Sequence, residues 1–293
     1  MKGFPESLRI GTCSWKYNSW VGLIYPANVG ENYLTEYAKH FNIVEVDQWF
    51  WSSFGEKIVL PKPETISEYA SSVPKEFRFS VKVPNAITLT HQYSKGKKGA
   101  LEVNPYFLSN DLFEKFLKIL EPMESQIDSL IFQFEYLNKE KMPNQNSFQD
   151  QLEKFFERTP PAGRHCIEIR NKNFLNKSYF SFLQAKKLHH VFLQGYWMPS
   201  IFMIYEQFKE YIEKHTVIRL HGPDRKGIEQ KTQNRWDAIV DPRDDELHSL
   251  NNMVNSLLAK EVQVTLSVNN HYEGCAPITV KKFLKIFSGE PFI

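Results

Sequence analysis

Eight strand-like runs, most of them followed by a segment with helical spacing, constrain the fold of this 293-residue chain more than any other feature. In the last run, Val262–Asn269, apolar and polar residues alternate with the period of two that is typical of a strand. Between the runs, apolar residues recur at helical spacing, as in 112–120, where Ser109 or Asn110 is available as the N-cap. The other seven runs are Leu8–Cys13, Ile43–Phe50, Phe77–Val83, Ser129–Phe134, His165–Arg170, His190–Gln194 and Thr216–His221.

This alternation predicts an α/β fold in which residues 1–293 form a single-domain (β/α)8 TIM barrel. The structural alternative is an open doubly wound sheet, which would need a glycine-rich first turn to bind a nucleotide phosphate. Ile10–Ser14 offers only one glycine, so the barrel is favoured. If the sheet closes, the run at 262–269 closes it, and its last pairing partner must lie near the N-terminus.

Two connections are longer than a barrel needs, and both follow strands, the third and the seventh. The first, 84–110, contains the basic stretch Ser94–Gly99, and the second, 222–245, contains Asp224–Gly227. In a barrel, both loops lie on the C-terminal face, where functional loops concentrate.

Composition and charge narrow the classes of function. A net charge of +2 gives no strong reason to expect a polyanionic partner, so nucleic-acid binding is not favoured. The N-terminus lacks the apolar core of a signal peptide and no later run is long enough to span a membrane, so we expect a cytoplasmic protein. Cys13, Cys166 and Cys275 are far apart, which predicts buried free thiols. The oligomeric state is left open.

Polar side chains gather where the predicted strands end. Glu168 and Arg170 lie two residues apart, as do Arg219 and His221, so each pair projects to one side of the sheet. A satisfied ion-pair network is the alternative to a ligand site, but a barrel core is normally apolar, and the excess of charge favours a site. The candidate catalytic residues are Glu45, Glu168 and His221, and the candidate ligand-binding residues are Trp15, Tyr25, Asp47, Lys82, His91, Gln133, Arg170, Arg219, Asn269 and Asn270.

Several chemistries remain open for these groups. Glu45 and Glu168 have the residue types of a glycosidase acid–base pair, although their separation decides the mechanism. His221 and His91 have the side chain that titrates near neutral pH, and a structural histidine is an equal alternative for each. No cofactor is predicted, and a divalent metal is less favoured because no clustered motif such as H-E-x-x-H is present.

The chain resembles the YecE-like family, known as domain of unknown function seventy-two, over almost its whole length. The matching motifs are Ile10–Trp15 with Trp20, Gly22, Tyr25 and Pro26; Phe41–Val46; Phe77–Pro84 with Thr88 and His91; Ile167–Arg170; Arg219–Gly222; and Val268–His271 with Ala276 and Pro277. The resemblance implies a TIM barrel, similar to those of xylose isomerase and endonuclease-four-type proteins, but supplies no reaction.

This chain departs from the usual pattern of the family at two places. It has Gln133–Tyr136 where many members have a Gln-Leu-Pro-Pro turn, and Asp47–Trp51 where many have Asn-Ser-Thr-Phe-Tyr. We therefore expect a different pocket wall, and with it a different ligand.

The leading hypothesis is an enzyme, a hydrolase or an isomerase, that acts on a small polar ligand such as a sugar, a phosphate ester or a carboxylate. Arg170, Arg219 and Lys82 would hold the anionic part, and Glu45, Glu168 or His221 would transfer protons. One alternative is a nucleic-acid-processing or nucleic-acid-binding protein, motivated by the barrel analogy, the basic loop and the exposed aromatic residues. The other is a non-catalytic ligand-binding protein.

Overall fold

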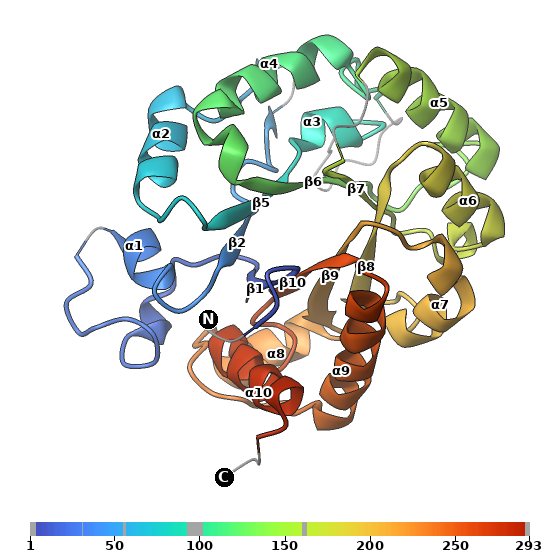
Figure 1. Cartoon of the computed structure of the whole chain (residues 1–293). Helices are drawn as coiled ribbons and strands as arrows, with labels where there is room; N and C mark the ends of the chain where they lie inside the picture. Colours follow the sequence, from blue (N-terminus) through green and yellow to red (C-terminus); the bar gives the residue numbers. More distant parts are fainter. Residues whose placement is uncertain (1–3, 31, 55–56, 93–101, 160–162, 291–293) are drawn as a thin grey trace.

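The centre of the protein is one sheet of eight parallel strands that curls into a nearly closed barrel, with helices around it (Figure 1). The structure is a computed structural model that describes residues 4–30, 32–54, 57–92, 102–159 and 163–290. The strand order is β1-β10-β9-β8-β7-β6-β5-β2, which confirms the predicted TIM-barrel fold. The strands are β1 (Leu8–Thr12), β2 (Ile43–Val46), β5 (Arg78–Lys82), β6 (Ile127–Gln133), β7 (His165–Glu168), β8 (His189–Gly195), β9 (His215–Gly222) and β10 (Gln263–Val268).

The last strand pairs with the first, as the alternating pattern predicted. β10 lies parallel to β1, with Leu8 opposite Val264 and Thr12 opposite Val268. On its other edge β10 pairs with β9, so the polar residues that follow β10 lie between the ends of β1 and β9.

Side chains, rather than a strand ladder, close the seam between β1 and β2. Asn42 accepts a hydrogen bond from the backbone N–H of Ile10 at 2.8 Å and donates one to the carbonyl of Leu8 at 3.3 Å. The buried Tyr37 hydroxyl accepts from the N–H of Thr12 at 2.8 Å and donates to the carbonyl of Ile43 at 3.1 Å. These bonds satisfy backbone groups that a closed ladder would otherwise pair.

The backbones approach closely at this seam, which explains Gly11. A Cβ atom at Gly11 would overlap the carbonyl oxygen of Ile43. Only glycine therefore allows β1 to lie this near to β2.

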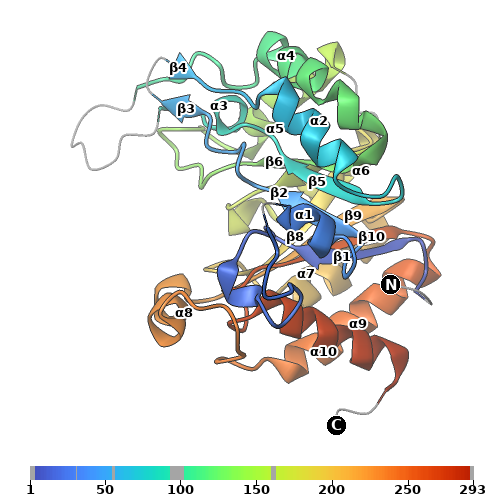
Figure 2. The ribbon, with the colours of Figure 1, turned by 90° about the vertical axis from the view of Figure 1, so that its left-hand side faces the viewer.

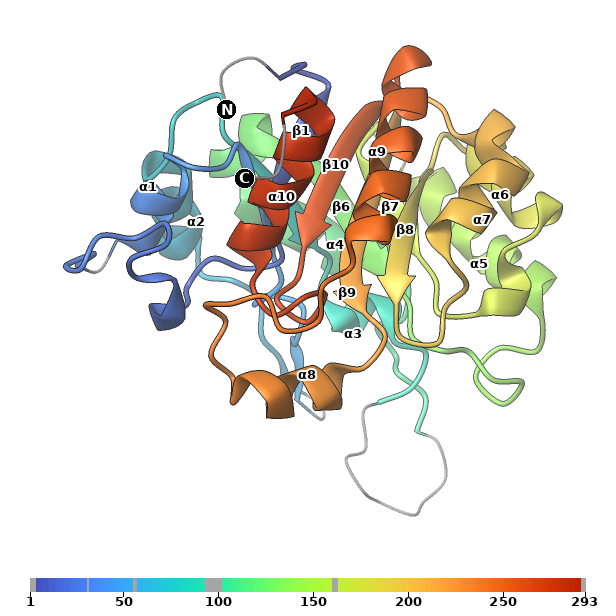
Figure 3. The same ribbon diagram turned by 90° about the horizontal axis from the view of Figure 1, so that it is seen from below.

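The helices cover the outside of the barrel and also lie across one of its ends. Figures 2 and 3 place α3 and α8 at the end toward which the strand arrowheads point, away from both termini. The helices are α1 (Tyr33–Tyr37), α2 (Pro63–Ser71), α3 (Asn85–Thr88), α4 (Asn110–Leu120), α5 (Gln145–Arg158), α6 (Lys177–Ala185), α7 (Ile201–Phe208), α8 (Arg225–Thr232), α9 (Asp244–Ala259) and α10 (Ala276–Ser288).

Three details differ from the sequence-based expectation. β2 ends at Val46 instead of Phe50, because a turn closes where Phe50 N–H bonds to the carbonyl of Asp47 at 3.0 Å. A short antiparallel hairpin, β3 (Ser53–Phe54) with β4 (Lys57–Ile58), follows. The long connection after β9 contains α8, which begins where the Asp224 carboxylate accepts from Gly227 N–H at 2.9 Å.

The barrel interior is layered along the strand direction. Ile131, Cys166, Val191 and Val217 form a small buried apolar cluster separate from the main core. Residues two positions further along β7 and β9 are Glu168 and Arg219, and His215 lies two positions before Val217. Since side chains two apart share one side of a strand, an apolar layer lies between two polar ends of the barrel.

We predict that Tyr37→Phe lowers the free energy of unfolding by about 1–3 kcal/mol, because it leaves buried backbone groups at the β1–β2 seam without their partner. Urea unfolding followed by circular dichroism measures this loss. The matched control is Tyr33→Phe, since the Tyr33 hydroxyl bonds to Asn18 at an exposed site. Equal losses in the two variants would contradict the role of Tyr37 at the seam.

Candidate functional site

The barrel mouth, at the C-terminal ends of the strands, is built around Arg219 of β9, whose side chain is 1% exposed. Its Nε and one terminal nitrogen each donate to the Glu45 carboxylate at 2.7 Å. The other terminal nitrogen donates to Glu168 and, at 3.3 Å, to the Gln133 side-chain oxygen. All three guanidinium nitrogens therefore have acceptors within the protein.

Glu168 of β7 lies between two arginines. One oxygen accepts from Arg219, and the other lies 2.6 Å from a terminal nitrogen of Arg170. Burial alone would raise the pKa of Glu168, but the charges of Arg170 and Arg219 outweigh it and lower the pKa to about 2. Glu168 is therefore ionised at neutral pH and unsuited to carrying a proton. We call Glu45, Glu168 and Arg219 the inner ion-pair layer.

Asp47 and Lys82 lie beside this layer and titrate much closer to neutrality. Burial, and then the charge of Glu45, raise the pKa of Asp47 to about 6. Burial, and then the charge of Arg219, lower the pKa of Lys82 to about 8. The Lys82 ammonium lies 4.0 Å from the centre of the Phe50 ring. These shifts have the direction and size that functional sites favour.

Tyr196, His221 and Cys13 form a chain of contacts that borders the mouth. His221 Nδ1 lies 3.1 Å from the Tyr196 hydroxyl, and His221 Nε2 lies 3.7 Å from the Cys13 sulfur. Burial, and then the charge of Arg219, hold the pKa of His221 well below its ordinary value, so the imidazole is neutral. The Tyr196 ring also lies against the Arg170 guanidinium, 5.0 Å from the ring centre.

Tyr196 and Cys13 were not predicted as site residues. Tyr196 directly follows β8, so the strand-end argument would have found it had the run at 190–194 been extended by two residues. Its backbone is in the left-handed region, with φ of 56°, and its N–H bonds to the carbonyl of Gly222 at 2.9 Å. Cys13 was predicted only as a buried thiol, and the structure adds its contact with His221.

Four predicted ligand-binding residues make contacts within the loops around the mouth. Trp15 is 5% exposed and packs edge-on against Tyr69, and the Tyr25 hydroxyl donates to the Trp15 carbonyl. The side chain of Asn270 accepts from Ala276 N–H at the start of α10, at 2.9 Å. Asn269 accepts from His271 N–H at 2.9 Å.

His91 belongs to a separate group on the long connection after β5. Its Nδ1 lies 3.0 Å from the Thr90 hydroxyl, which bonds to Glu135 at 3.3 Å. The basic residues 95–98 of the same connection lie outside the described residues. The structure thus brings together Glu45, Asp47, Lys82, Gln133, Glu168, Arg170, Arg219 and His221 of the predicted site.

Two kinds of feature are absent from the described residues. No group of three or more His, Cys, Asp or Glu side chains is arranged there to hold a metal ion. In the same part of the chain, no helix is long and apolar enough to cross a membrane.

The fold and the mouth define an α/β-barrel protein of the TIM-barrel class, with charged groups at the C-terminal ends of its strands. Residues 9–291 match the family model described as protein of unknown function DUF72, and the chain belongs to this family.

Comparison with known proteins agrees with this assignment. A DUF72 family protein from Enterococcus faecalis V583 superposes with a TM-score of 0.67 at 20% identity, over 96% of this chain and 95% of that one. One from Thermotoga maritima MSB8 gives a TM-score of 0.63 at 17% identity, over 96% and 99%. The Escherichia coli K12 UPF0759 protein YecE is 28% identical over 169 residues, which are 57% of this chain and 50% of that protein. The match thus spans about half the length of that relative.

We predict that Arg219→Met lowers the free energy of unfolding at pH 7 by about 3–5 kcal/mol, because it leaves the buried Glu45 without its ion-pair partner and Glu168 with Arg170 alone. The deficit relative to the parent protein should narrow as the pH falls toward 5, since protonation neutralises carboxylates whose pKa has risen. Chemical unfolding across this pH range measures both effects. The control is Arg158→Met, which removes an exposed ion pair of 3.6 Å. A deficit that is independent of pH would contradict the role of Arg219.

Proposed function

We propose that the chain is an enzyme that acts on a small polar ligand carrying an anionic group, bound at the mouth of the barrel. The observation that supports the proposal is that the charged groups at the mouth form two sets, one saturated by contacts within the protein and one that is not. Arg219 is saturated by the protein's own carboxylates, whereas Asp47, Lys82 and Arg170 surround it with unused capacity. A network that served stability alone would not need this second set of groups.

Arg170 and Lys82 would hold the anionic part of the ligand. Nε of Arg170 is buried and has no hydrogen-bond partner among the described residues. The interactions of Lys82 with the described residues include the Phe50 ring but no ion pair. Buried donors normally have acceptors, and a phosphate or carboxylate would supply them. Arg219, assigned to this task on sequence alone, instead positions Glu45 and Glu168.

Asp47 is the group best suited to proton transfer. Its pKa of about 6 allows it to exist in both protonation states near neutrality. Glu168, with a pKa of about 2, would stay ionised, and His221 would stay neutral. Glu45 is held by two bonds to Arg219. We therefore move the proton-transfer role from Glu45, Glu168 and His221 to Asp47, in a hydrolase or isomerase type of reaction.

Aromatic side chains around the mouth support a ligand with a flat face, such as a sugar ring. Trp51, Tyr136 and Trp197 are 58%, 55% and 61% exposed, and they follow three different strands, β2, β6 and β8. Such rings stack on sugars and on bases. The same observation favours nucleic-acid binding as the second candidate function.

We predict that Asp47→Asn lowers kcat by about 10²–10⁴-fold while leaving ligand affinity nearly unchanged, as expected for loss of a general acid or base. A panel of sugar phosphates, phosphate esters and hydroxy acids is first screened by calorimetry and by turnover. Lys82→Met should instead weaken binding. If Asp47 acts as the base, the parent rate should rise as the pH passes about 6, the pKa of Asp47.

The control variant is Glu135→Gln, which makes the same change of charge at a carboxylate outside the inner ion-pair layer. This carboxylate pairs with Lys141. Full activity in Asp47→Asn would refute the assigned role. Binding without turnover across the panel would favour the non-catalytic alternative, and steeply salt-dependent binding of DNA or RNA would favour the nucleic-acid alternative.

A further inference from the structure

A polar cavity lies at the opposite end of the barrel from the mouth, where the strands begin. Its volume is about 330 Å³. The described residues that line it include the first residues of β5, β6, β9 and β10, and Arg9 of β1. The apolar layer of Ile131, Cys166, Val191 and Val217 separates it from the inner ion-pair layer. The lining residues are Arg9, Arg78, Ile127, Asp128, Gly163, Lys214, His215 and Gln263.

The only carboxylate among these lining residues, Asp128, is already saturated. Its side chain is 1% exposed. It accepts hydrogen bonds from Gln263 at 2.7 Å and from Thr265 at 2.6 Å. It also lies 3.0 Å from Nε of Arg9 and 3.4 Å from Nε2 of His215. Asp128 therefore has no remaining capacity to neutralise Arg78 or Lys214.

His215 adds a positive charge to the cavity wall. Burial by itself would lower the pKa of His215, but the neighbouring Cys166 and Asp128 outweigh burial and raise it to about 10. The imidazole is therefore protonated at neutral pH, and both ring nitrogens are donors. Among the described residues that line the cavity, four side chains are thus cationic and one is a carboxylate.

The two remaining cations, Arg78 and Lys214, carry charges that no carboxylate among the described residues neutralises. One terminal nitrogen of Arg78 donates to the carbonyls of Lys75 and Phe77, at 2.7 and 3.1 Å, and these neutral acceptors leave its charge uncompensated. Lys214 forms no ion pair with the described residues. Burial, and then the charge of Arg78, lower the pKa of Arg9 against the attraction of Asp128 and the nearby Glu6. Two guanidinium groups therefore repel each other across the cavity.

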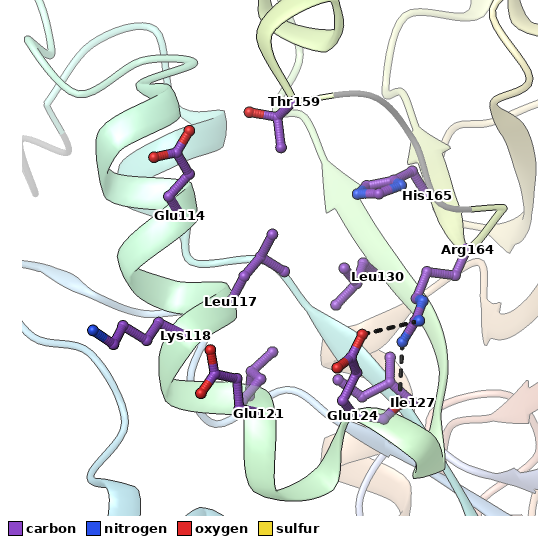
Figure 4. Close-up of a pocket in the computed structure, with 11 residues that line it drawn as sticks. Glu114, Leu117, Lys118, Glu121, Glu124, Ile127, Leu130, Thr159, Arg164 and His165 are labelled. Atoms are coloured by element: carbon purple, nitrogen blue, oxygen red, sulfur yellow. Dashed lines mark hydrogen bonds and ion pairs between the residues drawn. The ribbon is translucent and has the colours of Figure 1, made fainter.

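A neighbouring hollow has no surplus of positive charge among its described residues, so the surplus is confined to the cavity at the strand starts. The hollow, about 320 Å³, lies between α4 and the starts of β6 and β7 (Figure 4). One of its cations, Arg164, donates to the backbone carbonyl of Glu124 at 3.1 Å and lies 3.5 Å from the Glu124 carboxylate. Among the described residues that line this hollow, the carboxylates of Glu114, Glu121 and Glu124 outnumber the cations Lys118 and Arg164.

We infer that the cavity at the strand starts is a binding site for a small, multiply charged oxyanion, such as a phosphate group. A doubly charged tetrahedral anion accepts from several donors at once, and it relieves the repulsion between Arg9 and Arg78. Planar guanidinium forks are well matched to phosphate oxygens. The volume exceeds what inorganic phosphate fills, so it also leaves room for the remainder of a phosphate monoester. This site is independent of the proposed reaction at the mouth.

Calorimetric titration of the whole protein with inorganic phosphate, at constant ionic strength set with chloride, tests the inference. Because phosphate can also bind at the mouth, the titration is repeated in Lys82→Met, and we expect saturable binding with a stoichiometry of one at the strand starts to persist in that variant. Arg78→Gln and Lys214→Gln should each weaken it at least about tenfold, a change expected for loss of a charge-assisted contact. Arg164→Gln removes the same charge from the neighbouring hollow and should leave the affinity unchanged.

Unfolding midpoints establish that each variant is folded before it is titrated, and the exposed Lys214 provides a second variant where Arg78→Gln is unstable. Glycerol 1-phosphate, titrated in parallel, distinguishes the sources of the anion. Tighter binding than inorganic phosphate supports a phosphate monoester, and equal binding supports phosphate itself. Absence of saturable binding, or an equal loss in Arg164→Gln, would overturn the inference.

Discussion

The buried guanidinium of Arg219 is the constraint on which the mouth of the barrel depends. Moving an ion out of water costs several kcal/mol, so its carboxylate partners must be in place when the barrel closes. Those partners, Glu45 and Glu168, come from β2 and β7, which are far from β9 along the chain. These ion pairs therefore constrain how β2, β7 and β9 meet across the lumen.

This fixed layer also positions the groups assigned to function. Asp47, Arg170 and His221 each lie two residues beyond a member of the inner ion-pair layer, and side chains two apart project to the same side of an extended chain. The charges of the inner ion-pair layer then shift the pKa values of the outer groups. Burial makes the largest contribution to each shift; in the same direction as burial, Glu45 raises the pKa of Asp47, and Arg219 lowers the pKa values of Lys82 and His221. The inner ion-pair layer thus adds to the effect of burial on the protonation states of the outer groups.

The two ends of the barrel follow the same geometric rule with different outcomes. Along β9, His215, Val217, Arg219 and His221 occupy successive inward positions from the strand starts to the mouth. Val217 belongs to the apolar layer between them. In the inner ion-pair layer, two carboxylates compensate one cation, whereas among the described residues at the strand starts one carboxylate faces several cations. The surplus of positive charge at the strand starts is the reason that we infer an external anion there.

Three features of the protein could be predicted from the amino-acid sequence alone: the eight strands, the closure of the sheet by β10 against β1, and the side-by-side projection of Glu168 with Arg170 and of Arg219 with His221. These features follow from local periodicity, which a single strand expresses without its neighbours. Other features became visible only in the folded protein: Arg219 is saturated by Glu45 and Glu168, Tyr196 borders the mouth, and Asp128 leaves Arg78 and Lys214 uncompensated. Such assignments depend on distances between residues far apart in the chain and on burial, because desolvation and neighbouring charges together set each pKa.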